Sequence, residues 1–352
     1  MHGRASLLAL LGAAVALAAP AVASATKVYF LQGEQVTGVD RPGTTVREAV
    51  QALVAGPTAA EAARGFETYV PAGTPIRAIA FENGVATVDL GERFVKGRLA
   101  DDLNARLTQL VYTVTEVPGV TSVRVLIKGG KPLGLFPGFL VTKPVTRKAV
   151  ERPAVPPPLP PPPAQPGQAT DETRVLQQRL ADLGFLDPTG VDGVAGPQTK
   201  AAVIGFQKWA RLGRDGVVGP ATSAALAAAT RPTPITSGSG RRVEVLLDRQ
   251  LALLVDGATV VRTIHVATGA AATPTPAGTY AVYRKAEKDW SVPFQVWLPW
   301  ATYIVGGIAF HEYPDVPVAP ASHGCIRVTR FDARTVYDFT PVGTQVKVLA
   351  VS

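Results

Sequence analysis

The sequence predicts a multidomain chain in which an α+β domain, a small three-helix bundle and a mostly-β domain follow one another. Three observations support this fold class. The length of 352 residues exceeds that of one ordinary domain, two linker-like segments interrupt the chain, and the hydrophobic periodicity changes from block to block. With 47% hydrophobic and 18% charged residues, the chain has enough apolar side chains to form a core in each block.

The composition also excludes several classes of function. The formal net charge is +8, which favours an anionic partner or surface, but no Lys/Arg run is present, and we expect no nucleic-acid partner. One cysteine, Cys325, cannot form an intrachain disulfide or a CxxC zinc site. With only four histidines, a dense metal cluster is not expected either, and we predict no metal and no cofactor.

Residues 1–25 have the three-part pattern of a secretory signal peptide. Arg4 lies in a short basic region, an apolar stretch covers residues 7–19, and residues 23–25 (ASA) form a small-x-small cleavage pattern. The apolar stretch is shorter than the roughly 20 residues of a spanning helix, which favours cleavage over a retained membrane anchor. We therefore predict export to the periplasm or the cell wall.

Two linkers define the predicted domain boundaries. Residues 153–166 contain nine prolines and are expected to form a polyproline II spacer, with a proline-rich recognition motif as the alternative. Residues 230–240 (TRPTPITSGSG) form a second, softer linker. The predicted organisation is a signal peptide at 1–25, an α+β domain at 26–150, a Pro-rich linker at 151–169, a helical domain at 170–229, a linker at 230–240 and a mostly-β domain at 241–352.

The first block mixes helix and strand patterns. We expect strands at 27–31, 76–81, 85–90 and 122–127, helices at 46–54 and 103–114, and a hairpin turn at Asn83-Gly84. It resembles the GerMN domain of spore-germination proteins in the segments VYF (28–30), LVAGP (53–57), VPAGT (70–74) and VATVDL (85–90). These motifs imply a fold and indicate no catalytic group or ligand.

The second block contains an internal repeat, because DGVAGPQT (192–199) recurs as DGVVGPAT (215–222). Asp-Gly favours a tight turn, and Gly-Pro places proline in the first turn of a helix. A further helix ends at Gly184, which predicts a three-helix bundle. The block resembles the peptidoglycan-binding domain of cell-wall hydrolases. The alternative is that the repeat serves only the folding of the bundle.

The third block is dominated by strand patterns at 243–248, 251–255, 260–267, 278–283 and 344–351, with a hairpin turn at Asp256-Gly257 and a short helix at 330–337. The single cysteine lies in SHGCIRV (322–328), and His311 precedes it by 14 residues. A cysteine nucleophile reacts as a thiolate, and a nearby imidazole can accept its proton. The backbone N–H groups of Gly324 and Cys325 are candidates for stabilising an oxyanion.

At these residues the block resembles the catalytic domain of YkuD-type L,D-transpeptidases. The shared pattern is a histidine followed by S/T-H-G-C-x-R/N, together with the loop TG…PTPAGTY (268–280) and WLPW (297–300). The spacer from His311 to Ser322 is shorter than in many members. Glu312 stands where glycine or serine often follows the histidine, and its backbone carbonyl would have to orient the imidazole.

The resemblance implies a cysteine-dependent acyltransferase. Cys325 would attack the carbonyl of the third residue of a tetrapeptide stem, D-alanine would leave, and an amine from another stem would complete a 3→3 cross-link. The roles implied for the other residues are general base and acid for His311, site geometry for His323, an oxyanion N–H for Gly324, and substrate binding for Arg327, Ser322, Tyr303 and Trp300. A structural ion pair is the alternative for Arg327. His265 is expected to be an ordinary strand residue near the cleft.

Two alternatives remain open at this level. An L,D-carboxypeptidase would use the same acyl-enzyme and resolve it with water, and a non-catalytic wall-binding protein would keep only the scaffold. The expected partners are peptidoglycan stems and glycan strands, with a carbapenem as covalent inhibitor. No specific protein partner is predicted.

Overall fold

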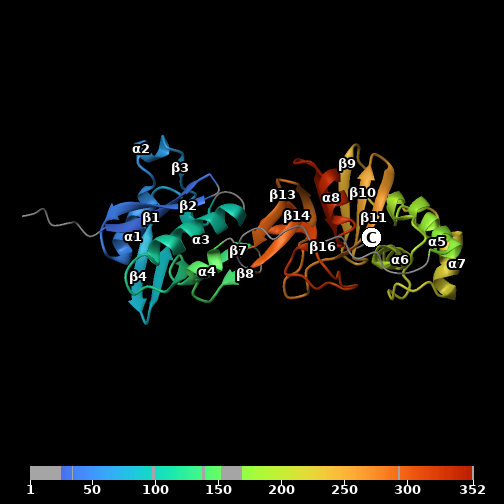
Figure 1. The fold of residues 1–352 in the computed structure, drawn as a ribbon, viewed down its shortest axis with the longest axis horizontal. Coiled ribbons are helices and arrows are strands. Elements are labelled where there is room, and N and C mark those ends of the chain that lie inside the picture. The colour runs from blue at the N-terminus through green and yellow to red at the C-terminus, as the bar shows by residue number, and fades with distance from the viewer. Residues whose placement is uncertain are drawn as a thin grey trace, which may run out of the picture.

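The computed structural model describes residues 25–33, 35–96, 100–136, 139–151, 169–291 and 294–350. The predicted signal peptide and the Pro-rich segment 153–166 lie outside these residues, apart from Ala25. The described chain forms three groups of elements, and Figure 1 shows the mostly-β group between the other two. The predicted multidomain fold class is confirmed. Among the described residues, no helix has the length and apolar character needed to cross a membrane.

The N-terminal group is an α+β domain with two small sheets, ordered β2-β1-β3 and β4-β5-β6-β7-β8. Its strands and helices are β1 (Ala25–Gln32), β2 (Gln35–Pro42), α1 (Val46–Ala55), α2 (Ala59–Ala62), β3 (Phe66–Glu67), β4 (Ile76–Glu82), β5 (Val85–Leu90), the 3-10 helix η1 (Glu92–Phe94), α3 (Ala100–Val114), β6 (Ser122–Ile127), β7 (Lys131–Phe136), β8 (Phe139–Val141) and α4 (Arg147–Val150). The predicted hairpin is present, with Asn83 and Gly84 both at positive φ between antiparallel β4 and β5.

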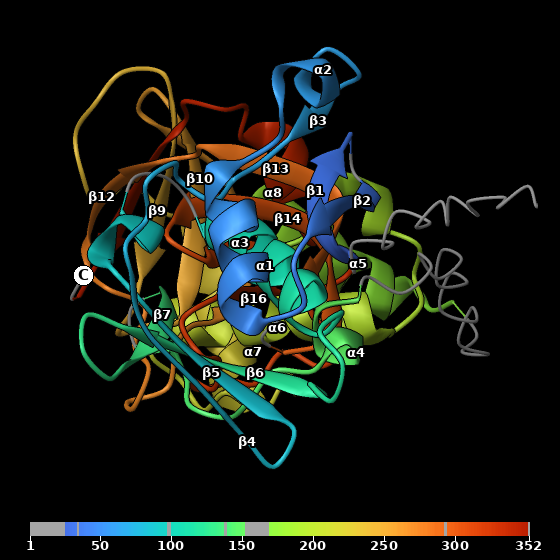
Figure 2. The same ribbon diagram turned by 90° about the vertical axis from the view of Figure 1, so that its left-hand side faces the viewer.

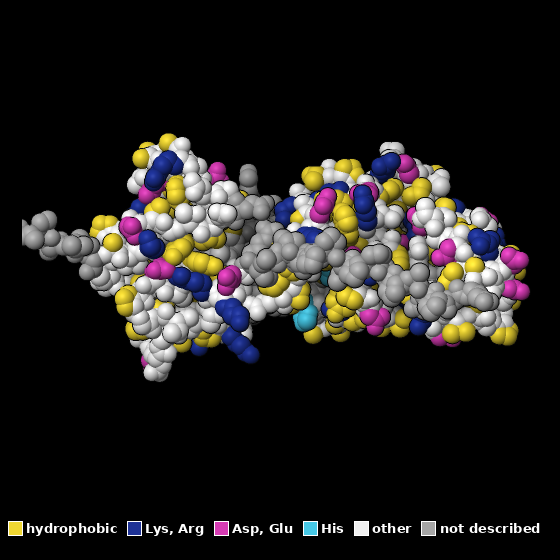
Figure 3. Space-filling view, viewed as in Figure 1, with side chains coloured by type: hydrophobic (Ala, Val, Ile, Leu, Met, Phe, Trp, Pro, Cys, Tyr) yellow, Lys and Arg dark blue, Asp and Glu magenta, His cyan; other side chains and the backbone are white. Residues whose placement is uncertain are grey.

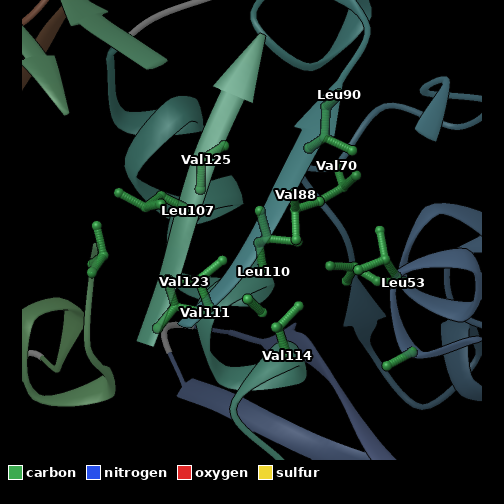
Figure 4. Packing of buried hydrophobic residues seen from close by; sticks show 14 of the residues in the cluster. Leu53, Val70, Val88, Leu90, Leu107, Leu110, Val111, Val114, Val123 and Val125 are labelled. Carbon is green, nitrogen blue, oxygen red and sulfur yellow. The ribbon is translucent and has the colours of Figure 1, made fainter. Parts of the chain in front are cut away.

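The core of this domain forms where α3 covers the sheet strands β5 and β6. Their alternating valines point toward leucines and valines of α3, and the side chains of Val88, Val111 and Val123 are fully buried (Figure 4). Helix α1 packs beside α3, as Figures 1 and 2 show from two directions. A capping box between Thr45 and Glu48 begins α1.

The second group is a three-helix bundle of α5 (Asp171–Asp182), α6 (Pro197–Trp209) and α7 (Pro220–Ala228), with a 3-10 turn η2 (Pro188–Gly190). The two copies of the repeat surround two buried glutamines. Gln177 donates to Asp192 Oδ1, Val194 O and Thr199 Oγ1 and accepts the Gly193 N–H. The second glutamine has the same partners in the second copy.

That second glutamine is Gln207, which donates to Asp215 Oδ1 at 2.7 Å, Val217 O at 3.0 Å and Thr222 Oγ1 at 3.2 Å. It accepts the Gly216 N–H at 2.8 Å. The aspartate, glycine and threonine of each copy are therefore bonded within the bundle. This arrangement supports the interpretation of the repeat as a folding device.

The third group is one curled mixed sheet of nine strands, ordered β12-β17-β9-β10-β11-β16-β15-β14-β13. The elements are β9 (Arg241–Leu246), β10 (Leu251–Asp256), β11 (Thr259–Ala267), β12 (Gly278–Ala281), β13 (Arg284–Ser291), β14 (Val296–Val305), β15 (Ile308–Glu312), β16 (Ile326–Val328), α8 (Ala333–Phe339) and β17 (Gln345–Leu349). Helix α8 covers the apolar core on one face, which contains Ile264, Phe310 and Ile326. Helix α6 contacts β10 and β11.

The segment 230–240 is bonded to both neighbouring groups. Arg231 donates to Asp182 O in the bundle and to Val260 O in the sheet. Glu244 accepts from Thr236, which lies in this segment, and from Arg242. Arg242 in turn donates to Thr236 O. The bundle and the sheet are therefore joined by a hydrogen-bonded connection, which differs from the soft linker that the composition predicts.

Candidate active site

Two neighbouring strands carry the candidate reacting groups. β15 and β16 pair in parallel, with His311 opposite Arg327 and Phe310 opposite Ile326. Phe310 and Ile326 belong to the core, so His311 and Arg327 lie on the other face of the sheet. Cys325 directly precedes Ile326, and the Ala309 N–H, two residues before His311, is directed at its thiol. The topology therefore brings Cys325, the residue directly before β16, beside β15, the strand that carries His311.

A network of hydrogen bonds shapes the turn before the cysteine. Ser322 Oγ accepts the Gly324 N–H at 3.1 Å and donates to Cys325 O. Gly324 has φ +114°, a conformation that side chains other than glycine rarely adopt. Thr275 Oγ1 donates to Gly324 O at 2.7 Å and accepts from the Gly269 N–H. Ser322 thus supports the turn, and the N–H of Gly324, the expected oxyanion donor, is directed at Ser322.

The loop that follows β11 packs against this turn. Thr268 O accepts the N–H groups of Ala321 and Ser322, and Ala270 N donates to Ser322 O. A Cβ atom at Gly269 would lie 2.2 Å from Thr273 O, so this position requires glycine. The TG and PTPAGTY motifs identified in the sequence therefore hold the cysteine turn in place through their backbone.

His311 has the tautomer that a general base needs. Its Nδ1 lies 2.8 Å from Glu312 O and donates to it, because a carbonyl can only accept. Nε2 therefore carries the lone pair. Burial lowers the pKa of His311 to about 4, and the positive charge of Arg327 acts in the same direction. The imidazole is neutral near pH 7, and Glu312 orients it through its carbonyl.

Cys325 is a half-buried, unpaired thiol. Burial raises its pKa, while the Ala309 N–H and the Arg327 charge oppose that shift. Its sulfur lies 3.6 Å from Gly307 O. Burial therefore favours the neutral form of both side chains, the thiol of Cys325 and the imidazole of His311.

His323 lies two residues before Cys325 in the sequence, and Arg327 lies two residues after it. His323 is exposed and stacks against Phe294, with ring centroids 4.9 Å apart. The Arg327 guanidinium lies over the ring of Tyr313 at 3.9 Å. Among the described residues, no carboxylate is within ion-pair distance of Arg327, so its charge is available to a carboxylate from outside.

Comparison with known families accounts for all three groups of elements. Residues 240–348 match the L,D-transpeptidase catalytic domain (YkuD), residues 27–134 match a sporulation and spore germination domain, and residues 170–226 match a peptidoglycan binding domain. An L,D-transpeptidase from Xylanimonas cellulosilytica (residues 123–326) is 40% identical. The match covers 55% of this chain and 100% of that chain, with a TM-score of 0.49. The chain belongs to the L,D-transpeptidase family.

Other solved structures are more distant. An L,D-transpeptidase from Stackebrandtia nassauensis is 25% identical, covering 53% of this chain and 94% of that one, with a TM-score of 0.35. An LD transpeptidase in complex with imipenem is 20% identical, covering 32% and 60% of the two chains, with a TM-score of 0.30. No curated protein matches the sequence. Family membership rests on the 40% identity over a whole solved chain.

Tyr303 and Trp300, both expected to bind substrate, lie in different surroundings. Tyr303 is only 4% exposed, and its hydroxyl donates to Asp289 Oδ2 at 2.5 Å. Its ring packs under Arg284, so it supports the strand β14 and offers little surface to a substrate. Trp300 is half-buried between Tyr337 and Arg334 and lines a pocket that also includes His311.

This pocket has a volume of about 820 Å³. It is formed by the first half of β14 (residues 296–300), by residues 311–315, and by Arg330 and Arg334 beside α8. Its walls are largely apolar, with charges of both signs at the edge. His311 lines this pocket, whereas Cys325, His323 and Arg327 are not among its lining residues.

Several elements and residues around the site were not predicted from the sequence. The strands β13 to β16, which carry Tyr303 and His311, were missed. Tyr313, which stacks on Arg327, was not named, although an aromatic residue two positions after the histidine is a visible signal. Among the described residues, no cluster of His, Cys, Asp and Glu has the composition of a metal site.

Proposed function

We propose that the protein forms 3→3 cross-links in peptidoglycan through a Cys325 acyl-enzyme. The observation that supports this proposal is that Cys325 directly precedes β16, the strand paired with the one that carries His311, and that Nδ1 of His311 is bonded to Glu312 O. That tautomer leaves Nε2 to accept a proton. The membership of the chain in the L,D-transpeptidase family supports the reaction class.

In the first half-reaction, His311 Nε2 accepts the thiol proton as the sulfur attacks the carbonyl of the third stem residue, a diamino acid. A C–S bond forms, and the negative charge moves to the carbonyl oxygen. The backbone N–H of Cys325 would stabilise this oxygen, since the N–H of Gly324 is bonded to Ser322 Oγ. The C–N bond to D-alanine then breaks, and the proton on His311 passes to the leaving amine.

In the second half-reaction, a side-chain amine of another stem attacks the thioester carbonyl. His311 accepts a proton from this amine and returns it to the departing sulfur, so that a new amide forms and the enzyme is regenerated. Arg327 would bind a carboxylate of a stem, which fits a guanidinium that no described carboxylate pairs. His323, exposed beside the turn, would line the entry.

The other regions support an enzyme that acts on the cell wall. The signal-like residues 1–25 would direct export, and the peptidoglycan binding domain would bring the catalytic domain to an insoluble substrate. Figure 3 shows Lys/Arg and Asp/Glu side chains interspersed over the visible face, without a large area of one sign.

The test uses the mature protein, disaccharide-tetrapeptide as substrate and Cys325→Ala as control. We expect a cross-linked dimer with released D-alanine from the wild type and no product from the variant. Tripeptide without dimer would assign the protein as an L,D-carboxypeptidase. No product from either protein would leave a wall-binding role. A carbapenem such as imipenem should add to the wild-type protein once, giving a single adduct in the intact mass.

A further inference from the structure

A lysine of the second domain is buried in the third. Lys208, near the end of α6, has no exposed surface. Its Nζ lies 3.0 Å from Gln250 O, 2.9 Å from Val266 O and 2.7 Å from His265 Nδ1. All three acceptors belong to the β10–β11 region of the catalytic domain. An ammonium group has three donors, and here each donor has one acceptor.

His265 links Lys208 to the segment between the candidate reacting residues His311 and Cys325. His265 Nε2 lies 3.1 Å from Val316 O, which can only accept, so Nε2 carries the proton and Nδ1 receives that of Lys208. Val316 lies in the crossover, residues 313–325, which joins His311 to Cys325. Lys208, His265 and Val316 therefore form a continuous hydrogen-bonded path from the second domain to the crossover.

A second path starts at the same lysine. The side chain of Gln250, whose carbonyl accepts from Lys208, is bonded to the N–H and the hydroxyl of Thr268 at 2.8 Å each. Thr268 O in turn accepts the N–H groups of Ala321 and Ser322. The crossover is thus held near its start through Val316 and near its end through Ser322. Arg214 of the second domain adds an outer contact with Val318 O at 3.3 Å.

This arrangement is unfavourable if it serves stability alone. Burying an ammonium group costs several kcal/mol on the order-of-magnitude scale, and well-packed apolar residues often stabilise an interface as well or better. Desolvation lowers the pKa of Lys208 to about 6, and the nearby charge of Arg214 acts in the same direction. The three partners of Nζ are all acceptors, and only the ammonium form supplies three donors to them. Among the described residues, no carboxylate is in ion-pair contact with Lys208. Retention of this lysine therefore calls for another role.

We propose that Lys208 is a positioning residue: through His265 and Gln250 it fixes the crossover that carries Cys325, so that the second domain forms part of the catalytic structure in addition to binding the wall. This inference rests on the proposed cysteine chemistry for its effect on rate. Its structural part, the ordering of the crossover, does not depend on that chemistry. His265, expected to be an ordinary strand residue, is the central link.

The test compares four variants of the mature full-length protein at pH 7. Lys208→Met keeps the length of the side chain and removes its donors. His265→Leu breaks the path, whereas His265→Gln keeps one acceptor and one donor. Arg249→Met is the matched control in the same interface, because Arg249 stacks on the Trp209 ring at 4.6 Å and donates to Trp209 O, both on the bundle side.

Two measurements are made on each variant. Amide hydrogen exchange at Ala321 and Ser322 reports the order of the crossover, and the rate of single acylation by imipenem reports the reactivity of Cys325. We expect Lys208→Met and His265→Leu each to speed exchange and slow acylation about tenfold, with melting temperatures unchanged or raised. The double variant should be no slower than either single variant. His265→Gln should recover most of the rate, and Arg249→Met should resemble the wild type.

Wild-type exchange in Lys208→Met, or an acylation rate that falls only in proportion to lost stability, would overturn the inference. An equal fall in the acylation rate of His265→Gln and His265→Leu would also overturn the inference. If the wild type itself is not acylated, the proposed function fails, and the exchange measurements still decide whether Lys208 orders the crossover. If Lys208→Met does not fold, the surface variant Arg214→Ala takes its place, with faster exchange expected at the amides of Val318 and Ala319.

Discussion

The repeat of the second domain and the cysteine turn of the third are both short motifs with polar residues, but they use those residues differently. In the repeat, Gln177 and Gln207 are buried, and each bonds its own aspartate, glycine and threonine. In the cysteine turn, only Ser322 is used in this way. Cys325 is half-buried and His323 is exposed. A motif whose polar groups are all bonded to each other builds a fold, whereas one that leaves reactive groups accessible can act on a ligand.

The largest expected effect is at His311, and it tests the reactive side of this comparison. His311→Gln keeps a hydrogen-bonding side chain of similar size but cannot serve as a base. We expect acylation of Cys325 by imipenem to fall by about 10³-fold, within the range for loss of a general base, with little change in unfolding. Stopped-flow or mass-spectrometric kinetics would measure it. A rate within threefold of the wild type would exclude His311 as the base.

The next largest effect is expected at Gln177 and Gln207, and it tests whether the repeat serves folding. Gln177→Leu and Gln207→Leu each leave a buried glycine N–H, a carbonyl and an aspartate without their partner. We expect each to lower the free energy of unfolding by about 2–4 kcal/mol in urea titrations. Thr170→Ala, at the exposed N-cap of α5, is the control, with an expected change of about 1 kcal/mol for the lost bond between its side chain and the Thr173 N–H. Normal stability with loss of murein binding would instead make the repeat a ligand site.

A third prediction concerns pH. Because burial lowers the pKa of His311 to about 4, the imidazole stays neutral down to that pH. The acid limb of kcat/KM for acylation should therefore have its midpoint near pH 4 instead of near 6.5, where an unperturbed histidine would place it. Acylation rates from pH 3.5 to 7, with circular dichroism as a check on folding, would measure this limb. A midpoint near 6.5 would show that His311 is solvated in the reactive protein.

The same shift affects stability. The folded-state pKa of His311 lies below the unfolded-state value, so the unfolded chain binds more protons between about pH 4 and 6.5. The contribution is fully present above pH 6.5 and is lost as the pH falls toward 4. His311→Gln should flatten this part of the pH dependence of unfolding.

The smallest expected effect is at Tyr303. Tyr303→Phe removes the hydroxyl that bonds Asp289 and leaves the buried ring in place. We expect a loss of about 1 kcal/mol in unfolding free energy and an unchanged KM for the tetrapeptide. A several-fold rise in KM without loss of stability would restore the substrate-binding role that the sequence suggested.

The sequence predicted elements with local signals and missed those that depend on distant contacts. The helix at 46–54 and the hairpin around Asn83-Gly84 were correct because caps, turn residues and periodicity lie within the segment itself. Strand β13 was missed since residues 284–291 are polar and half-buried on both faces, which removes the alternation. Strand β16 has only three residues and depends on its neighbours β11 and β15.

The site divides in the same way. The sequence named Cys325 and His311 as candidates by residue type and by resemblance to the family motif, and it named the Glu312 carbonyl as the group that would have to orient the ring. The path from Lys208 to Val316 could not be predicted, because a lysine on a helix is ordinarily exposed. Its burial results from packing between two domains, and a single sequence holds no local pattern for such a contact.

The crossover between β15 and β16 also limits how this site can change. Parallel neighbours require a connection of about a dozen residues or more, and residues 313–325 are close to that minimum. Shortening would pull the two strands out of register, whereas additional residues could be accommodated at the surface. We therefore expect this segment to tolerate insertions better than deletions.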